Sequence, residues 1–126
     1  AYEIRNCDWS SNVCSSDLRI GYVASEVTKH GGIAICAAIA PYAAARKVAR
    51  DLVEAEGSFI EIFVNTPIDE CIERDPKGLY KKALNGEIKG FTGIDAPYEE
   101  PQNPEIEIKN MTIDESVNFI INSLKI

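Results

Sequence analysis

Apolar residues recur at helical spacing in the stretch that begins near residue 19. One stripe has them at positions i, i+3, i+4 and i+7: Ile20, Val23, Ala24 and Val27. Two glycines follow His30, and a glycine after the last periodic residue is a common helix stop. The pattern predicts an amphipathic helix that begins near Arg19, ends at Gly31 and packs against another element.

The next pattern is an unbroken apolar run, IAICAAIA, over residues 33–40. A run of this length is typical of a parallel strand that is buried on both faces, and its Cys36 is then expected to be a small buried hydrophobe. Pro41 suits the first position of a helix, which we expect to run to Gly57. The sequence FIEIFV, residues 59–64, predicts a second strand.

The C-terminal half continues the alternation of helix and strand. Thr66 is expected to cap a helix that contains Pro67, has Asp69 reaching back to free amides, and reaches Arg74. IEI, residues 106–108, is a weaker strand candidate, and Thr112 with Glu115 predicts a capping box. The helix after it has one apolar face: Val117, Ile120, Ile121 and Leu124. This order predicts an α/β fold with a parallel sheet and helices on both faces.

Composition narrows the functional classes. The chain has 126 residues, of which 45% are hydrophobic, enough for one domain. A net charge of −7 argues against nucleic-acid binding, which needs clustered cations. No apolar run has membrane-spanning length and no signal peptide is recognisable, so we expect a cytoplasmic protein with no membrane partner. The chain has four cysteines: Cys7, Cys14, Cys36 and Cys71. No two of them form a CxxC pair, which argues against a zinc site.

The first eighteen residues differ in character from the rest. Residues 8–18, DWSSNVCSSDL, resemble the translation of a widely used sequencing adapter and differ from it only at Asn12. Residues 1–4 match another part of the same primer, and Arg5 and Asn6 occupy the place of its barcode. The alternative is a genuine Ser-rich leader. We expect residues 1–18 to be adapter-derived and the domain to occupy residues 19–126, so Cys7, Cys14 and Trp9 have no functional role.

A segment rich in glycine and lysine, about residues 75–98, separates the second and third predicted strands. Four lysines give this segment its positive charge: Lys77, Lys81, Lys82 and Lys89. The charge would suit a lid over a polyanionic ligand, and the alternative is a solvated basic loop. Lys89 stands two residues before Phe91, between Gly90 and Gly93. An aromatic face suits a nucleobase and a nearby ammonium suits its phosphate, although Phe91 could equally anchor the loop.

Three stretches together resemble the adenylylsulfate (APS) kinase family: GGIAICAAIAPYAAARK, FIEIFVNTPIDECIERDPKGLY and KGLYKKALNGEIKGFTGIDAPYEEP. The IAPY form is most similar to the kinase domain of bacterial fusions with sulfate adenylyltransferase. The resemblance implies a P-loop kinase fold with a five-stranded parallel sheet. It also implies phosphorylation of the APS 3′-hydroxyl by ATP with Mg²⁺, giving PAPS.

The resemblance also implies roles for particular residues. Those expected at APS are Ile39, Ala40, Arg46, Lys77, Lys89, Gly90 and Phe91. Those expected at ATP are Arg74, Thr112 and Ile113, with the alternative that Arg74 only faces a helix dipole. Two positions depart from the family: Ala40 stands where others have serine, and Ala43 where arginine is frequent. No metal ligand is assigned.

The sequence contains no GxxxxGK[ST] loop, which such kinases use to hold ATP phosphates. We therefore expect a truncated sheet without the P-loop strand, an uncovered edge at residues 33–38, no assignable catalytic residue and no activity from this chain alone. The implied parent is a homodimer, fused to or associated with sulfate adenylyltransferase. Alternatives are a non-catalytic PAPS-binding regulatory domain and another small-molecule P-loop kinase, such as a nucleoside monophosphate or gluconate kinase.

Overall fold

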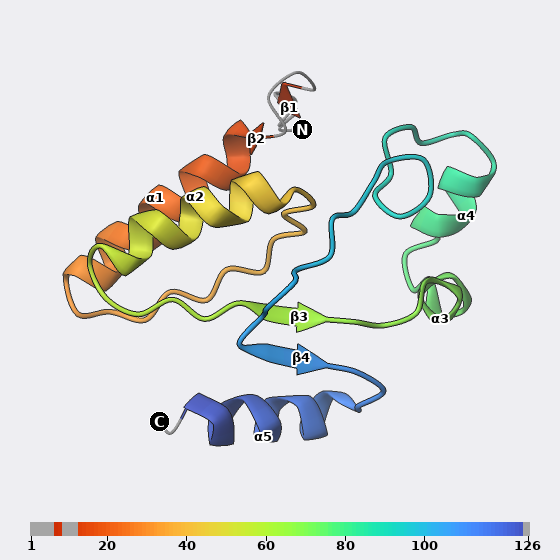
Figure 1. Cartoon of the computed structure of the whole chain (residues 1–126). Helices are drawn as coiled ribbons and strands as arrows, with labels where there is room; N and C mark the ends of the chain where they lie inside the picture. The colour runs from red at the N-terminus through yellow and green to blue at the C-terminus, as the bar shows by residue number, and fades with distance from the viewer. Residues whose placement is uncertain (1–6, 9–12, 125–126) are drawn as a thin grey trace. The chain divides into compact units, whose positions relative to one another are not determined.

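The computed structural model describes residues 7–8 and 13–124, and the chain divides into two compact units, Ala1–Phe59 and Ile60–Ile126. The first unit contains β1 (Cys7–Asp8), β2 (Val13–Cys14), α1 (Ser15–Lys29) and α2 (Ala43–Glu54) (Figure 1). The second contains β3 (Ile62–Val64), α3 (Ile68–Arg74), α4 (Leu79–Leu84), β4 (Ile106–Ile108) and α5 (Ile113–Leu124). None of the helices in the described ranges is long and apolar enough to cross a membrane.

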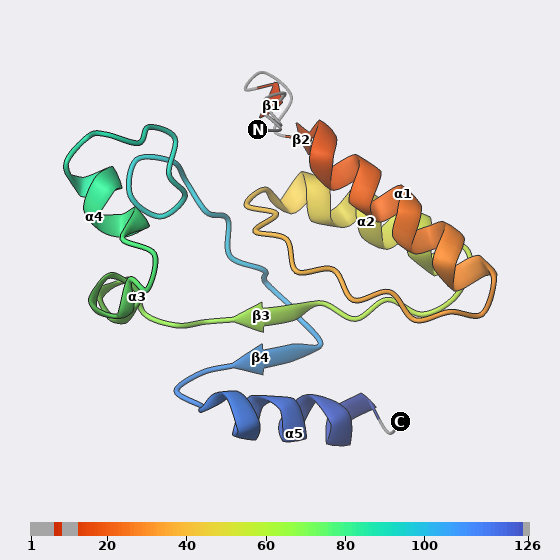
Figure 2. The same ribbon diagram turned by 180° about the vertical axis from the view of Figure 1, so that it is seen from behind.

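Helices α1 and α2 lie side by side in both views and form the core of the first unit (Figures 1 and 2). A Cβ added to Gly21 would lie 3.0 Å from both Cα and Cβ of Ala49, so the missing side chain is what permits the close approach. The α1 face buried here consists of small residues: Gly21, Ala24 and Ser25. The predicted packing stripe is therefore wrong except at Ala24. Val23 is 60% exposed because the helix turns its small residues to α2.

The predicted end of α1 is confirmed. Gly31 has φ +77°, and its amide donates to the Thr28 carbonyl at 2.9 Å. The amide of Gly32 donates to the Val27 carbonyl at 2.9 Å, which completes a Schellman motif. The start differs from the expectation, because the helix includes residues 15–18 and so begins before Arg19. Whether residues 1–18 derive from an adapter stays a prediction.

Residues 33–40 correct the strand expectation. The structure has no strand there, and Ile33 and Ile35 are 77% and 93% exposed. Cys36 is exposed as well, so its predicted burial is wrong. A strand exists only where a neighbouring strand satisfies its amides and carbonyls, and no strand of the described ranges pairs with this segment. The exposure agrees with the expected uncovered edge at residues 33–38.

Helix α2 begins later than Pro41 predicts. Tyr42 is extended, with φ −103° and ψ 129°, and is the N-cap. Its carbonyl accepts the first helical bonds, from the amides of Ala45 at 3.1 Å and Arg46 at 3.2 Å. Pro41 therefore lies outside the helix, and α2 ends at Glu54, before the expected limit at Gly57.

Strands β3 and β4 confirm the predicted parallel pairing. Ile62 pairs with Ile106 and Val64 with Ile108. Phe63 is buried, whereas the flanking residues of β3 are exposed, so the strand alternates. The paired part of the predicted run 59–64 is only its last three residues, because β4 offers three partners.

The helices of the second unit give one correction and one confirmation. Pro67, not Thr66, is the N-cap of α3, since its carbonyl accepts the amides of Glu70 and Cys71, both at 3.1 Å. The predicted end at Arg74 is confirmed. Helix α5 lies beside β4 (Figure 1), and its predicted apolar face has no buried residue among those described.

The capping box before α5 is confirmed. The Thr112 amide donates to a Glu115 carboxylate oxygen at 2.8 Å, and the Glu115 amide donates back to the Thr112 hydroxyl at 3.3 Å. The amide and hydroxyl of Thr112 hold the pKa of the Glu115 carboxyl below its usual value. Glu115 therefore stays ionised at the helix N-terminus, where negative charge is favourable.

Candidate functional site

The basic segment after α3 contains a short helix that the sequence did not predict, α4. Asp75 organises its start, because its carboxylate accepts the amides of Tyr80 at 3.2 Å and Lys81 at 3.0 Å. Desolvation by itself would raise the pKa of the Asp75 carboxyl, but backbone hydrogen bonds, led by that from Lys81, lower it below the usual value. The carboxylate thus satisfies amides that have no partner within the helix.

The loop that carries Phe91 is closed by hydrogen bonds within residues 90–96. The Asp95 carboxylate accepts the Gly90 amide at 2.7 Å and the Phe91 amide at 2.5 Å. In return, the Phe91 carbonyl accepts the amides of Asp95 and Ala96, both at 3.1 Å. The amides of Gly90 and Phe91 are the main reason that the pKa of Asp95 lies below its usual range, with a smaller contribution from the charge of Lys89.

The Phe91 ring is also held by an aromatic neighbour. The rings of Tyr80 and Phe91 meet edge to face, with centroids 5.0 Å apart. This geometry is favourable for two aromatic rings and joins α4 to the loop. Phe91 is half-buried, whereas Lys77 and Lys89 are exposed. The segment therefore brings a fixed aromatic ring and Lys89 together on one loop.

The other residues expected at APS lie in the first unit. Arg46 Nη1 of α2 donates to the Ala40 carbonyl at 2.8 Å, so the structure brings these two together. Ala40 has φ +40°, a left-handed conformation that is uncommon for alanine. Ile39 beside it is 68% exposed. The end of the 33–40 segment is thus held against the first turn of α2 by a cationic side chain.

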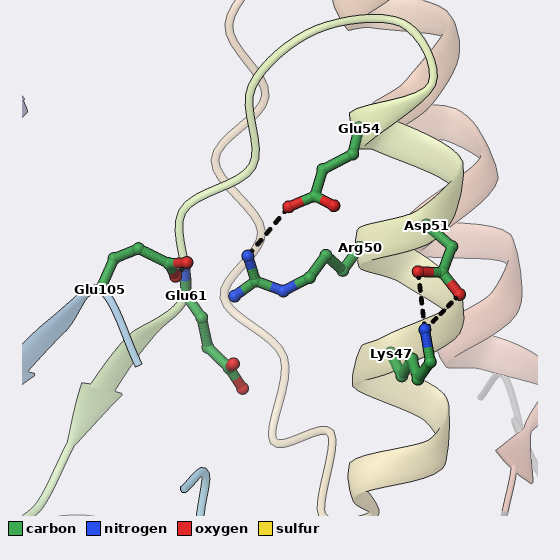
Figure 3. Close-up of polar contacts among 6 residues, drawn as sticks. All are labelled: Lys47, Arg50, Asp51, Glu54, Glu61 and Glu105. Carbon is green, nitrogen blue, oxygen red and sulfur yellow. Dashed lines mark hydrogen bonds and ion pairs between the residues drawn. The ribbon is translucent and has the colours of Figure 1, made fainter. Parts of the chain in front are cut away.

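Other cations of α2 are engaged with acids of the same helix (Figure 3). Lys47 Nζ lies 2.8 Å from a carboxylate oxygen of Asp51, and Arg50 Nη1 lies 3.0 Å from one of Glu54. The Arg50 guanidinium also lies 4.6 Å from the centroid of the Phe59 ring. Pairs at this i,i+4 spacing are common on helix surfaces, and neither of them involves the contact of Arg46 with Ala40.

Two of the three residues expected at ATP, Arg74 and Thr112, have structural partners in the second unit. Arg74 forms an ion pair with Glu70, one turn earlier in α3. Thr112 belongs to the capping box, and Ile113 is 82% exposed. Their contact with a nucleotide stays a prediction. Within residues 7–8 and 13–124, no group of three His, Cys, Asp or Glu side chains could hold a metal ion.

A depression of about 490 Å³ lies along α1 and contains none of the predicted site residues. Its walls are mostly apolar: Tyr22, Val23, Glu26, Val27, His30 and Gly32. His30 Nδ1 lies 2.8 Å from the Glu26 carbonyl, at the end of the helix. That contact agrees with a capping role for His30.

Sequence reasoning missed Asp75, Tyr80 and Asp95. The available signals were weak: Asp75 precedes Pro76, as turn residues often do, and Asp95 follows Phe91 by four positions. Only the loop conformation shows that each carboxylate turns back to amides. The structure thus adds organising residues to the segment of about residues 75–98, whose role as a lid stays a prediction.

Comparisons with known proteins agree on one family. A family model described as adenylylsulphate kinase matches residues 9–109. The adenylyl-sulfate kinase of Rippkaea orientalis is 51% identical over 109 residues, which cover 85% of this chain and 59% of that protein. The bifunctional enzyme NodQ of Rhizobium tropici is 54% identical over 93 residues, covering 74% of this chain and 15% of that protein.

The same family appears among solved structures. The Mycobacterium tuberculosis APS kinase CysC, in complex with AMPPNP and APS, superposes with a TM-score of 0.82 at 40% identity. The match covers 87% of this chain and 65% of that one. This chain therefore spans about three fifths of the length of these two single-function relatives, the kinases of Rippkaea orientalis and Mycobacterium tuberculosis.

Proposed function

Because the chain belongs to the adenylylsulfate kinase family, we propose that its parent protein transfers the γ-phosphoryl group of ATP to the 3′-hydroxyl of APS. The products are PAPS and ADP, and the hydroxyl loses its proton as the new O–P bond forms. The observation that carries the proposal is the lid loop, in which the Phe91 ring and the Lys89 ammonium share a backbone held by Asp95. This pairing suits a ligand that joins a nucleobase to an anion.

In this proposal Phe91 stacks on the adenine of APS. Gly90 lets the backbone approach the ligand, and Lys89 and Lys77 face its phosphosulfate. Stacking on an aromatic ring recognises a base by its π-face, and the lysines act as point charges toward the anion. Both lysines are exposed, so their ammonium groups can reach a ligand that enters from solvent.

For the first unit, taken by itself, the proposed APS residues rest on the family resemblance and on the local contact between Arg46 and Ala40. Ile39 and Ala40 would line the ligand with backbone and small side chains. The Arg46 charge, held beside the Ala40 carbonyl, would attract the anionic end of APS. The left-handed conformation of Ala40 supports this proposal, because such strain is concentrated at ligand-binding positions.

ATP would meet Arg74, Thr112 and Ile113, and Mg²⁺ would be its metal in the parent. The described residues do not fit a Mg²⁺ site, since no suitable carboxylate cluster occurs among them, and the sequence has no GxxxxGK[ST] loop. For the 126-residue chain alone, the proposal is APS binding without phosphoryl transfer.

The proposed setting is a cytoplasmic homodimer that is fused to or associated with sulfate adenylyltransferase. The match to a bifunctional enzyme, NodQ, supports the fusion. A nucleoside monophosphate or gluconate kinase is set aside by the family match over residues 9–109. A regulatory domain that binds PAPS remains the second candidate, since bifunctional relatives also fit that arrangement.

Calorimetric titration of the chain with APS tests the proposal. We expect Phe91→Ala to weaken APS binding about 5- to 150-fold, the range that stacking on one base provides. Phe119→Ala on α5 is the matched control, because Phe119 is an exposed phenylalanine outside the lid. Equal affinity for APS in Phe91→Ala and in the unsubstituted 126-residue chain would contradict the proposed site.

Two further measurements separate the alternatives. Tighter binding of PAPS than of APS would favour the regulatory domain over the kinase. ATP-dependent PAPS formation by the isolated chain would overturn its proposed inactivity. If the chain binds neither APS nor PAPS, the assignment of an APS site to this chain is wrong.

A further inference from the structure

We propose that Asp95 is a positioning residue, which holds the backbone of Gly90 and Phe91 so that the Phe91 ring is fixed before a nucleotide arrives. This inference rests on the proposed function, because it concerns how the APS site is organised. Asp95 itself need not touch the ligand. It acts through Phe91, the residue proposed to stack on adenine.

Both the side chain and the backbone of Asp95 make hydrogen bonds that support this role. Its two carboxylate oxygens accept different amides, at 2.7 Å from Gly90 and 2.5 Å from Phe91. The Phe91 carbonyl accepts the Asp95 amide at 3.1 Å, so each residue fixes the other. Charge-assisted hydrogen bonds of this kind are stronger than neutral ones.

A second carboxylate fixes the aromatic neighbour of Phe91. The Tyr80 amide donates to Asp75, and the Tyr80 ring meets the Phe91 ring edge to face at 5.0 Å. Asp95 thus holds the backbone of Phe91, while Asp75 holds the residue against which its ring rests. Fixing a side chain in its binding conformation strengthens binding, because less conformational freedom is lost when the ligand binds.

The same hydrogen bonds restrict how the loop can meet an anion. Backbone amides in a glycine-rich loop often form an anion-binding concavity. Here the amides of Gly90 and Phe91 already donate to Asp95. The anion of the ligand is therefore met by cationic side chains such as Lys89 and not by these two amides. A negatively charged Asp95 also lies close enough to Lys89 for their charges to interact.

The experiment combines nuclear magnetic resonance with APS titration of the full 126-residue chain. An amide proton bonded to a carboxylate changes its chemical shift when that carboxyl is protonated. The Gly90 and Phe91 amide signals should therefore titrate together, with a midpoint below the usual Asp value of about 3.9. In Asp95→Asn this titration should disappear.

The binding arm uses Asp95→Ala, Asp95→Asn and a control. We expect APS binding to weaken about tenfold in Asp95→Ala and less in Asp95→Asn, whose amide oxygen can still accept one bond. Asp69→Asn on α3 makes the same change in charge at an exposed residue outside the loop and should leave affinity unchanged. Nuclear Overhauser contacts between the Tyr80 and Phe91 rings should persist in the control and weaken in Asp95→Ala.

The outcomes distinguish this inference from the proposed function. If Phe91→Ala weakens APS binding but Asp95→Ala does not, the positioning role is wrong and the APS site stands. Absence of a shared titration of the two amides likewise overturns the positioning role. If the amides titrate as expected but the chain does not bind APS, the loop geometry stands and the proposed function of the chain fails.

Discussion

Replacing Gly21 with alanine tests the packing of α1 against α2. An added Cβ would lie 3.0 Å from Ala49 Cα and Cβ, closer than the 3.5–4.0 Å or so of favourable carbon contacts. One of the two atoms belongs to the backbone, so the helices themselves must separate. Overpacking of this kind costs about 1–3 kcal/mol.

A second effect has the opposite sign. Alanine is about 1 kcal/mol more favourable than glycine inside a helix, so the net expected loss in Gly21→Ala is about 0–2 kcal/mol. Gly21→Val places two further methyl groups against Ala49, and we expect it to lose at least about 1 kcal/mol more unfolding free energy than Gly21→Ala.

Urea unfolding followed by circular dichroism measures these changes. The matched control is the pair Val23→Gly and Val23→Ala, because Val23 is on the same helix but 60% exposed. At this position alanine should be more stable than glycine by about 1 kcal/mol. If Gly21→Ala gains as much stability as this control pair shows, the two helices are not in close contact and the reasoning is refuted.

Two other predictions concern α5 and the unpaired segment. Thr112→Ala should destabilise the chain by about 1 kcal/mol at neutral pH, as seen in urea unfolding, because it removes the N-cap. The Glu115 carboxylate makes the pH-dependent part of the box: its folded pKa is lowered, so the stabilisation from its bonds to Thr112 exists above the unfolded value of about 4.3 and is lost as pH falls through the folded value. A Thr112→Ala chain as stable as the unsubstituted chain at neutral pH would contradict the capping box. Ile35→Lys should change the unfolding free energy by no more than about 0.5 kcal/mol, since Ile35 is 93% exposed, and should raise the monomer fraction in sedimentation analysis. Ala45→Lys is the contrasting variant, and it should prevent folding because Ala45 is buried. A similarly large loss of unfolding free energy in Ile35→Lys would show that Ile35 is covered.

Local signals in the sequence were sufficient for two motifs that a characteristic pair of residues marks. The Gly31 stop and the box of Thr112 and Glu115 were both predictable, because each motif closes within a few residues. The parallel order of β3 and β4 followed from the alternation of helix and strand. The same reasoning placed the helix boundaries at Pro41 and Thr66 incorrectly, since the carbonyl that starts a helix depends on backbone conformation.

The candidate site also contains features that could be predicted and features that could not. The pairing of Lys89 with Phe91 could be predicted as a nucleotide-binding pattern from residue type and spacing. The contribution of Asp95 could not, because it requires a loop that turns back through residues 90–96. Arg46 was assigned to APS by resemblance, but only the structure places its guanidinium on the carbonyl of Ala40.

By itself, the sequence determined the family and the parallel order of β3 and β4, and it predicted which residues form a lid, because motifs and periodicity are properties of the chain order. The tertiary structure decided which face of α1 is buried and which carboxylates hold the lid. It also decided that residues 33–40 form no strand. The first and the last of these outcomes depend on groups far apart in the sequence: Gly21 has no packing role without Ala49, and an apolar run becomes a strand only when another strand pairs with its backbone. The bonds of Asp75 and Asp95 span only four to six residues, but they form only where the loop conformation turns each carboxylate back to those amides.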